Sequence, residues 1–329
     1  MLSEQDKILR LVRRSKLFVP VNREKFVAKA WTRGADCIIL DLEDSVPPSE
    51  KASARKMVKD VMPIVGQGGA EIQVRINREF EEEDLDAIVI PGLVSIMIPK
   101  CESADEIWLI DEMVTRLEKE RGLPMGSIQF DLLIETAVGI VNMESIVKAS
   151  PRVVQSSIGG VDLARDMGYT RAPDLGYDQF SWAAGKLRFV ARAAGVQASG
   201  LMPQNDVSFT DTRADPEAIL QACRRSFWVG YLGTAAIHPV WCEPINEGFK
   251  ASSAELDMAR RVKAALEEAY ARGEGSVAVE GRMYDVANLE HVNNVLERAE
   301  FVARREAEKA AAMAAVGAHT QVDSQKSKP

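Results

Sequence analysis

The sequence predicts an α/β fold in which eight parallel strands alternate with helices and close into a barrel. Short apolar runs recur along the chain, and amphipathic segments with helical spacing separate most of them. This alternation predicts a parallel sheet, because parallel strands need crossover connections, which are usually helices. The repeats occupy about 240 residues, close to the roughly 250 residues of a typical (β/α)₈ or TIM barrel. A doubly wound open sheet is the alternative, but no Gly-x-Gly-x-x-Gly follows the first strand.

The apolar runs give the expected strands in chain order. They are Lys16–Val21, Cys37–Leu42, Glu71–Ile76, Val94–Pro99, Gln129–Ile134, Val153–Ile158, Val196–Met202 and Thr234–His238. Three helices are expected between the first strands, over Glu24–Arg33, Glu50–Val65 and Ser103–Arg121, from apolar residues at helical spacing. Ser103 is followed three residues later by Glu106, which is the spacing of a capping box.

The pattern changes after the last expected strand, so residues 1–249 are assigned to the barrel. Residues 250–309 contain two long amphipathic helices around a Gly-rich turn, and we expect a helical appendage to the barrel that serves as an oligomerisation segment. The second helix carries an apolar stripe that must be buried, and a neighbouring subunit is one place for it. Residues 310–329 are rich in Ala, Ser, Gln and Lys without periodicity, and a disordered tail is expected there.

Composition and charge exclude several classes of protein. The net charge is −8 and no basic block interrupts the sequence, which argues against a nucleic-acid partner. The 4 cysteines form no Cys-x-x-Cys, so neither a disulfide framework nor a zinc site is expected. No stretch resembles a signal peptide or a membrane span. We therefore expect no membrane partner and a cytoplasmic location.

Two carboxylates follow two successive strands. Glu135 comes directly after the fifth expected strand, and Asp162 follows the Gly159-Gly160 turn that ends the sixth. The carboxyl ends of barrel strands meet over one site, and two oxygen ligands from different strands suit Mg²⁺, with Mn²⁺ as the alternative metal. Taken singly, each residue has a structural interpretation that is as good as metal binding. Glu135 can cap a helix, and Asp162 can be a charge at a helix N-terminus. As a pair on adjacent strands, they favour metal binding.

Arg75 ends the third expected strand and is a candidate catalytic residue. A guanidinium there could hold a carboxylate bidentately and stabilise a developing oxyanion. The structural alternative is an ion pair with Glu43 or Asp44 at the neighbouring strand end, and both roles can hold at once. Asp41 and Glu43 share one face of their strand by alternation and need cationic partners, for which Arg75 or Lys16 can serve. We expect these acids to support the site rather than to bind the metal.

Three further polar residues follow expected strands and are assigned supporting roles. Asn77 lies just beyond the third strand, next to Arg75 in the sequence pattern. Lys100 could form a Schiff base if desolvated, but an ion pair is the better interpretation because a metal already supplies the electrophile. His238 is the single histidine at a strand end, and a hydrogen-bonded structural group is the better interpretation of it.

Several motifs, in this order, resemble one known family. They are RSKLFVP at 14–20, KAWTRGADCIILDLEDSVPPSEKASAR at 29–55, VRIN at 74–77, IPKCES at 98–103, IETAVGIVNMESI at 134–146, GGVDLARDMG at 159–168, IHP at 237–239 and EGRMYD at 280–285. Together they resemble the citrate lyase beta-subunit-like branch of the HpcH/HpaI aldolase family, which includes malyl-CoA and citramalyl-CoA lyases. The resemblance covers the chain from Arg14 to about Leu296.

The resemblance implies a site shared between subunits. It implies Mg²⁺ on Glu135 and Asp162, with Arg75 on the substrate carboxylate or enolate oxygen. It implies a homo-oligomer, a trimer or hexamer, in which the C-terminal lid covers a neighbouring subunit and Asp285 acts as the acid/base. Arg14 and Lys16 match positions that help to hold coenzyme A, and Gly160 and Val161 are expected to line the substrate site.

The implied activity is a Mg²⁺-dependent carbon–carbon lyase. It would cleave or form a 3-hydroxyacyl-CoA, such as malyl-CoA or citramalyl-CoA, with a 2-oxo acid and an acyl-CoA as the other partners. The alternatives are a CoA-independent 2-oxo acid aldolase, a citrate lyase beta subunit that acts on a carrier-protein thioester, and a non-catalytic subunit that keeps the pocket.

Departures from the family pattern leave the acyl carrier and the substrate side chain open. Val21 stands where relatives commonly have Gly, Val161 where they often have an acidic or small residue, and ASGLMPQ at 198–204 lacks the usual acidic-glycine turn. Val21, Met202 and Trp241 are expected to make the mouth bulkier or more apolar.

Overall fold

The structure is a computed structural model that describes residues 8–168, 180–202 and 215–326. The chain divides into two compact units. One contains Arg13–Phe249 and the residues from Glu308 onward, and the other contains Lys250–Ala307 with the N-terminal segment up to Val12. Among the described helices, none is both long and apolar enough to cross a membrane.

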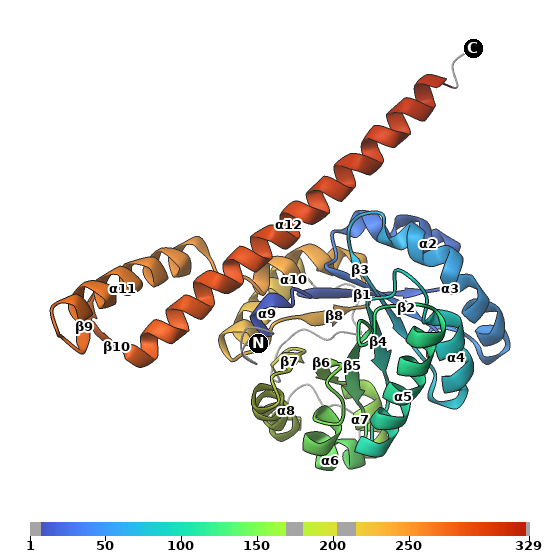
Figure 1. Cartoon of the computed structure of the whole chain (residues 1–329), viewed down its shortest axis with the longest axis horizontal. Coiled ribbons are helices and arrows are strands. Elements are labelled where there is room, and N and C mark those ends of the chain that lie inside the picture. The colour runs from blue at the N-terminus through green and yellow to red at the C-terminus, as the bar shows by residue number, and fades with distance from the viewer. Residues whose placement is uncertain (1–7, 169–179, 203–214, 327–329) are drawn as a thin grey trace. The chain divides into compact units, whose positions relative to one another are not determined.

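Eight parallel strands form the first unit (Figure 1). They are β1 (Ser15–Pro20), β2 (Cys37–Asp41), β3 (Glu71–Arg75), β4 (Ser95–Ile98), β5 (Gln129–Ile134), β6 (Val153–Ile158), β7 (Gln197–Ser199) and β8 (Thr234–Ala236). Strands β1 to β7 pair in sequence order and β8 pairs with β1. The Gly200 N–H donates to the Gly233 carbonyl at 2.8 Å, and the Leu232 N–H to the Ala198 carbonyl at 3.2 Å. These bonds bring the two edge strands together, and the predicted barrel is confirmed.

Helices connect the strands of the barrel and flank it (Figure 1). They are α2 (Glu24–Ala30), α3 (Lys51–Gly66), α4 (Glu81–Ile88), α5 (Ala104–Glu120), α6 (Ala137–Val147), α7 (Gly160–Asp166), α8 (Ser181–Ala193), α9 (Pro216–Trp228) and α10 (Cys242–Gly248). The predicted capping box at the start of α5 is present: Ser103 Oγ accepts from the Glu106 N–H, and the Glu106 carboxylate accepts from the Ser103 N–H.

The inward side chains of the strands form layers. Ile39, Met97 and Leu133 make a small buried apolar cluster, with Phe18 packed against it. Two residues earlier on β1 and β5 lies a polar layer, in which Lys16 Nζ is 2.5 Å from Asp131 Oδ2 and both side chains are fully buried. Two residues later on β2 and β5 come Asp41 and Glu135. The apolar layer therefore separates the strand-end residues from a buried ion pair lower in the barrel.

The second unit has its own core. Helix α11 (Ser253–Ala271), the hairpin of β9 (Ser276–Val279) and β10 (Arg282–Asp285), and the first part of α12 (Val286–Lys326) form it. Ala259, Val262 and Leu266 of α11 contact Val292 of α12, and Leu289, Val295 and Leu296 pack on this cluster. Part of the apolar stripe for which we considered a neighbouring subunit is thus covered within the chain, because α11 carries a matching face.

Helix α12 continues to Lys326, which differs from the disordered tail that we expected over 310–329. The first of these residues, AAAMAA at 310–315, are strong helix formers, so a helix needs no apolar periodicity here. Lys309, at the beginning of this part, donates from Nζ to Asp36 Oδ1 and to the Gly34 carbonyl in the barrel unit. The domain boundaries expected from the sequence stay predictions.

Asp36 provides a test of this attachment. Arg14 binds it through Nε at 2.8 Å and Nη2 at 3.1 Å, and Lys309 is its second cation. Burial alone would raise the pKa of Asp36, but Arg14 and Lys309 hold that pKa below its usual range. Replacing Asp36 by Asn leaves two buried cations without their carboxylate, which should cost about 3–5 kcal/mol in the free energy of unfolding measured with urea.

The exposed Asp60→Asn change on α3 serves as the control and should stay within about 0.5 kcal/mol of the wild type. The pKa of Asp36 is lowered by folding, so the wild-type advantage should be complete at neutral pH. It should shrink below about pH 4, as the pH falls through the depressed pKa. An Asp36→Asn protein as stable as the wild type at pH 7 would contradict this account.

Candidate active site

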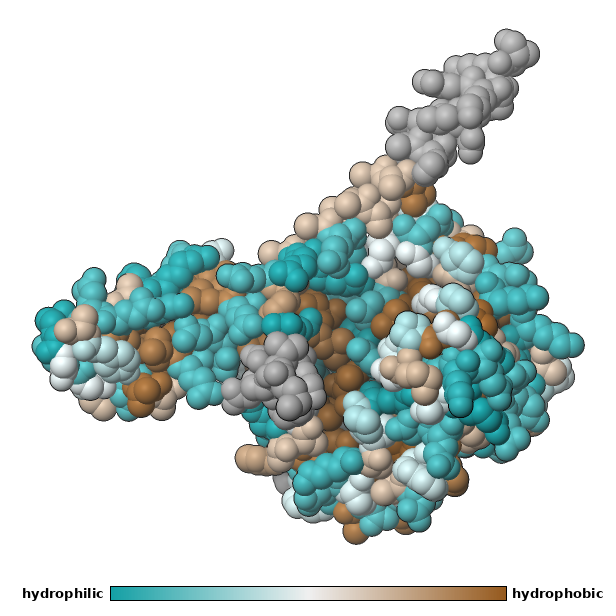
Figure 2. Space-filling view, in the orientation of Figure 1, coloured by the Kyte–Doolittle hydropathy of each residue, from teal (hydrophilic) through white to brown (hydrophobic). Residues whose placement is uncertain are grey.

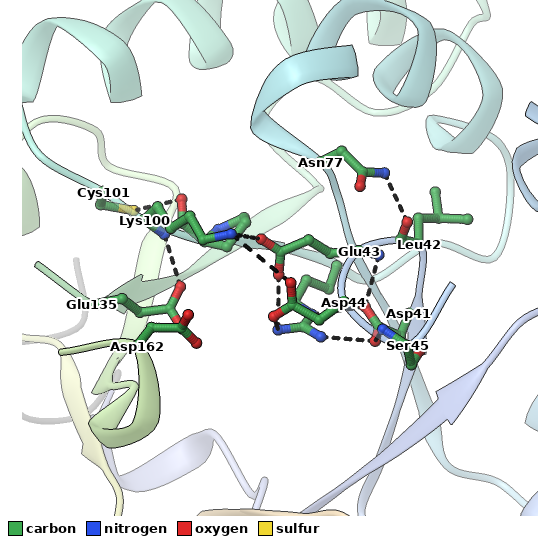
Figure 3. A network of polar contacts seen from close by, with 12 residues as sticks. Asp41, Leu42, Glu43, Asp44, Ser45, Asn77, Lys100, Cys101, Glu135 and Asp162 are labelled. Atoms are coloured by element: carbon green, nitrogen blue, oxygen red, sulfur yellow. Dashed lines mark hydrogen bonds and ion pairs between the residues drawn. The ribbon is translucent and has the colours of Figure 1, made fainter. Parts of the chain in front are cut away.

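The candidate site lies at the carboxyl ends of β2 to β6, above the apolar layer. Asp41 ends β2 and Arg75 ends β3, and the two are register partners. Glu135 follows β5, and Asp162 lies in the first turn of α7, after β6. Figure 3 shows the Glu135 and Asp162 side chains next to each other, with Lys100 between Glu135 and Glu43. The predicted strand-end residues are therefore brought together.

Arg75 is held on three sides. Its Nε and Nη2 donate to the two oxygens of Asp41, both at 2.7 Å. Its Nη1 is 2.9 Å from Glu43 Oε2 and 3.5 Å from Asp44 Oδ2. Its guanidinium carbon is 4.8 Å from the centre of the Phe18 ring. The structure thus has both ion pairs that we considered for Arg75, and it adds a bidentate pair with Asp41.

The charged groups around Arg75 shift one another's pKa values. Burial would raise the pKa of Asp41, but the hydrogen bonds from Arg75 hold that pKa below its usual range. Burial would lower the pKa of Arg75, but Asp41 and the acids beside it raise that pKa. Arg75 is therefore a permanent cation whose orientation is set by an ionised Asp41.

Lys100 and Glu43 form the next pair along the site. Lys100 Nζ donates to Glu43 Oε1 at 2.6 Å and is 3.9 Å from Asp44 Oδ1. Burial raises the pKa of Glu43 even though Arg75 and Lys100 both oppose the shift. Burial would lower the pKa of Lys100, but the hydrogen bond to Glu43 raises that pKa. The ion pair that we expected for Lys100 is present, so this side chain is not the deprotonated amine that a Schiff base needs.

Glu135 is the more buried member of the Glu135–Asp162 pair. It is 3% exposed, and its Oε2 accepts from the Lys100 main-chain N–H at 3.1 Å. Burial, followed by the carboxylates of Glu43 and Asp162, raises the pKa of Glu135 to about 8. A Cβ on Gly159 would be 2.4 Å from Glu135 Oε1, so only glycine leaves room for this carboxylate. A buried carboxylate beside two others is an environment that a bound cation would stabilise.

Asp162 is the second member of the carboxylate pair. Its side chain is 17% exposed, and Arg165 Nη2 lies 2.5 Å from its Oδ1. Within the described ranges there is no group of three or more His, Cys, Asp or Glu side chains arranged to hold a metal. Two carboxylates fit Mg²⁺, which commonly binds through one or two of them and keeps several waters, and they do not fit a zinc centre.

Arg14 and Lys16 lie away from these residues. Both side chains are fully buried, and each is paired with a carboxylate, Asp36 for Arg14 and Asp131 for Lys16. Arg14 precedes β1 and Lys16 is its second residue, so both belong to the amino ends of the strands. The coenzyme A contact that the resemblance implies for them stays a prediction.

The remaining predicted residues have structural contacts. Asn77 donates from Nδ2 to the Leu42 carbonyl at 2.8 Å and to Asp84 Oδ2 at 2.9 Å. His238 caps the short 3₁₀ helix Pro239–Trp241, with Nδ1 accepting from the Val240 N–H. Gly160 is the first residue of α7, and Val161, the second, is 68% exposed. Gly160 and Val161 therefore border the Glu135–Asp162 pair, whereas Asn77 and His238 support the chain around it.

Two of the three residues that we expected to make the mouth bulkier or more apolar are fully buried. Val21 and Trp241 belong to the main core, and Met202 is partly buried and packs against that core. The altered turn at 198–204 lies only partly within the described residues, which end at Met202 on this side.

Asp285 lies in the second unit, at the end of β10. Its Oδ1 accepts from the Ala287 N–H at 3.0 Å, and its own N–H donates to Asn288 Oδ1 at 2.9 Å, so it caps α12. Its carboxylate is half-buried. From the residues alone, Asp285 was a turn residue, and its capping contacts agree with that interpretation without testing the acid/base role.

Sequence analysis missed two contributors to the site, Phe18 and Gly159. Phe18 lies two residues after Lys16, so strand alternation was the available signal that it points into the barrel. Gly159 was noted only as a turn residue. The space that Glu135 needs beside it depends on the approach of β5 to β6, which the sequence does not show.

Comparison with known proteins decides the family. The model of the HpcH/HpaI aldolase/citrate lyase family matches residues 14–239. The chain belongs to this family. The citrate lyase subunit beta of Leuconostoc mesenteroides subsp. cremoris is 34% identical over 277 residues, covering 83% of this chain and 89% of the relative. An L-malyl-CoA/beta-methylmalyl-CoA lyase of Cereibacter sphaeroides is 33% identical over 310 residues, covering 88% and 95%. The family predicted from the motifs is confirmed, and these relatives are lyases.

A solved structure shares both the fold and the sequence pattern. CitE from Mycobacterium tuberculosis, in complex with magnesium, acetoacetate and coenzyme A, is 28% identical to this chain with a TM-score of 0.67. The match covers 88% of this chain and 99% of CitE. A citrate lyase beta subunit from M. tuberculosis in complex with oxaloacetate and magnesium is 26% identical, with a TM-score of 0.55 over 74% of this chain and 99% of that chain.

Gly159→Ala tests the space beside Glu135. The new Cβ would lie 2.6 Å from Glu135 Cγ, so the Glu135 carboxylate must leave its position. Because displaced metal ligands and their supports typically cost 10–100-fold in affinity, Mg²⁺ binding measured by calorimetry should weaken at least tenfold. Gly185→Ala in α8, where no atom lies within 4 Å of the added carbon, should leave the affinity unchanged. Equal Mg²⁺ affinities in the two variants would contradict the role of Gly159.

Proposed function

We propose that the protein is a Mg²⁺-dependent carbon–carbon lyase acting on a 3-hydroxyacyl-CoA. The observation that carries this proposal is the placement of the Glu135–Asp162 carboxylate pair beside Arg75 at the strand ends, within a chain of the HpcH/HpaI aldolase/citrate lyase family. Relatives whose names state a malyl-CoA or beta-methylmalyl-CoA substrate support the thioester. The magnesium and coenzyme A bound by M. tuberculosis CitE support the metal and the acyl carrier.

The chemistry assigns a task to each residue. Glu135 and Asp162 would hold Mg²⁺ or Mn²⁺, which as a Lewis acid lowers the pKa of a coordinated hydroxyl. The 3-hydroxyl group would lose its proton to water, the bond between C2 and C3 would break, and the electron pair would pass to the thioester as an enolate. Arg75 would face this negative charge with Nη1, which lies 2.9 Å from Glu43 Oε2 and is not used in the two hydrogen bonds to Asp41. Protonation of the enolate carbon gives the acyl-CoA, and the other product is a 2-oxo acid.

Asp285 is the proposed source of that last proton. In the reverse direction the same carboxylate would remove a proton from the acyl methyl group. This role requires the second unit to act as a lid, and we propose a homo-oligomer, a trimer or hexamer, in which the lid of one subunit serves the barrel of another. A lid that excludes water would protect the enolate from the wrong proton donor. A cytoplasmic location fits coenzyme A thioesters as substrates.

Removing either carboxylate should remove the metal. Glu135→Gln and Asp162→Asn each replace a charged oxygen ligand by an amide of the same shape, so Mg²⁺ binding measured by calorimetry should fall below detection. Glu144→Gln changes an exposed carboxylate on α6 and should bind Mg²⁺ as the wild type does. Unchanged affinity in the two site variants would refute the metal assignment.

Asp285→Asn should separate binding from proton transfer. An Asn side chain can still cap α12, so the fold around this position should survive. Mg²⁺ and 2-oxo acid affinities should stay within about twofold, whereas deuterium exchange into the methyl group of acetyl-CoA should be lost. The exposed Asp257→Asn change on α11 is the control. Normal exchange in Asp285→Asn would exclude Asp285 as the acid/base.

The substrate is tested by direct screening. Acetyl-CoA and propionyl-CoA would be combined with glyoxylate, pyruvate or oxaloacetate and Mg²⁺, with condensation followed by free thiol release and by mass. Turnover with a coenzyme A thioester is the expected result. The 34% identity to a citrate lyase subunit beta favours a second candidate, a subunit that acts on a carrier-protein thioester. Activity only with an acyl carrier protein would select that candidate, and cleavage of a 2-oxo acid without any thioester would select the CoA-independent aldolase.

A further inference from the structure

Lys100 makes hydrogen bonds to both halves of the site. Its main-chain N–H donates to Glu135 Oε2, in the carboxylate pair, and its ammonium group donates to Glu43 Oε1, beside Arg75. Figure 3 shows the residue between these two carboxylates, with its side chain turned toward Glu43. Among the residues that the structure describes, no other contacts both Glu135 and the acids around Arg75 through hydrogen bonds.

The backbone of Lys100 is in an unusual conformation. Its φ is 50°, in the left-handed region that favours glycine and asparagine. This turn lets the N–H point to Glu135 while the side chain returns toward Glu43 on the far side of β3. Such conformations persist where surrounding contacts hold them, and they gather at functional sites. Glycine would adopt this conformation without strain. The presence of lysine therefore indicates a role for its side chain.

The two oxygens of Glu43 are held differently. Oε1 accepts a hydrogen bond from Lys100, whereas Oε2, although 2.9 Å from Arg75 Nη1, has no hydrogen-bond partner among the described residues. The hydrogen bonds of Arg75 to these residues both go to Asp41. Glu43 is thus shared: it is hydrogen-bonded to Lys100 and ion-paired with Nη1 of Arg75, and Nη1 takes no part in the bidentate hydrogen bonds to Asp41.

We propose that Lys100 is a positioning residue that keeps Arg75 available to the substrate by binding the other oxygen of Glu43 and so sharing the charge that Glu43 presents to Arg75. Without the ammonium group, Glu43 would turn its charge fully to Arg75 and compete with the incoming oxyanion. The inference rests on the proposed function, in which Arg75 Nη1 receives a substrate oxygen. The Glu135 contact is made by the backbone, so it does not depend on the lysine side chain.

The experiment is a double-mutant cycle with four proteins. They are the wild type, Lys100→Met, Glu43→Gln and the double variant, each measured for oxaloacetate affinity at saturating Mg²⁺ by calorimetry and for kcat/KM with the thioester that the wild type uses. Lys100→Met should lower both about tenfold, and adding Glu43→Gln should recover most of the loss, because an amide does not compete for Arg75 by charge. Mg²⁺ affinity should stay within about twofold throughout, since the Lys100 N–H remains.

A matched control and two readouts separate the possible failures. Lys148→Met removes a lysine that is ion-paired with a glutamate at 2.7 Å on the surface of α6, and it should change none of these quantities. A double variant no better than Lys100→Met would overturn the inference and point to direct substrate contact by Lys100. If the wild type turns over no thioester, only the lyase proposal is refuted. The inference on Lys100 is still tested, because the oxaloacetate affinities of the four proteins can be compared. Equal affinities in all four proteins would overturn the inference on Lys100.

Discussion

The bidentate ion pair between Arg75 and Asp41 sets the arrangement of the whole site. The two residues are register partners at the ends of β3 and β2, so the hydrogen-bond ladder of the sheet brings them opposite each other. Phe18 lies under the guanidinium and keeps water from that face. In such surroundings the effective dielectric constant is low, and both charges are strongly coupled. The fixed guanidinium of Arg75 then sets the positions of Glu43, Asp44 and Lys100.

The layers inside the barrel explain why this charge cluster can exist. Barrel interiors are usually filled with branched apolar side chains. Here the apolar layer around Ile39, Met97 and Leu133 is thin, and a second ionic layer with Lys16 and Asp131 lies below it. The lower layer pairs one cation with one carboxylate, whereas the upper layer holds Arg75 and Lys100 against a larger number of carboxylates. The upper layer alone faces the mouth, which confines chemistry to the carboxyl ends of the strands.

Local patterns predicted the fold well, because they report on local physics. The strands were found from apolar runs, and the Ser103–Glu106 capping box from a spacing of three residues. What the sequence did not show needed long-range information. The buried carboxylate partners of Arg14 and Lys16 are 22 and 115 residues away along the chain, so local patterns did not show these ion pairs. The apolar stripe of α12 was visible, but periodicity says nothing about which helix covers it. Glu135 and Asp162 were placed together because strand ends of a barrel converge, whereas the Glu135–Gly159 contact needed the actual distance between strands.

The division of the chain makes the segment 250–307 an insertion rather than a tail. The chain leaves the barrel unit after Phe249 and belongs to it again from Glu308, where Lys309 reaches Asp36. A segment closed at both ends loses less conformational entropy when it orders than a segment attached at one end, since loop closure has already restricted it. It also means that cutting the chain within residues 250–307 would not release this segment cleanly. The fragment beyond the cut would still carry the part of α12 that contributes a buried lysine to the barrel unit, so a cut in the inserted segment also separates Lys309 from the chain that precedes the cut.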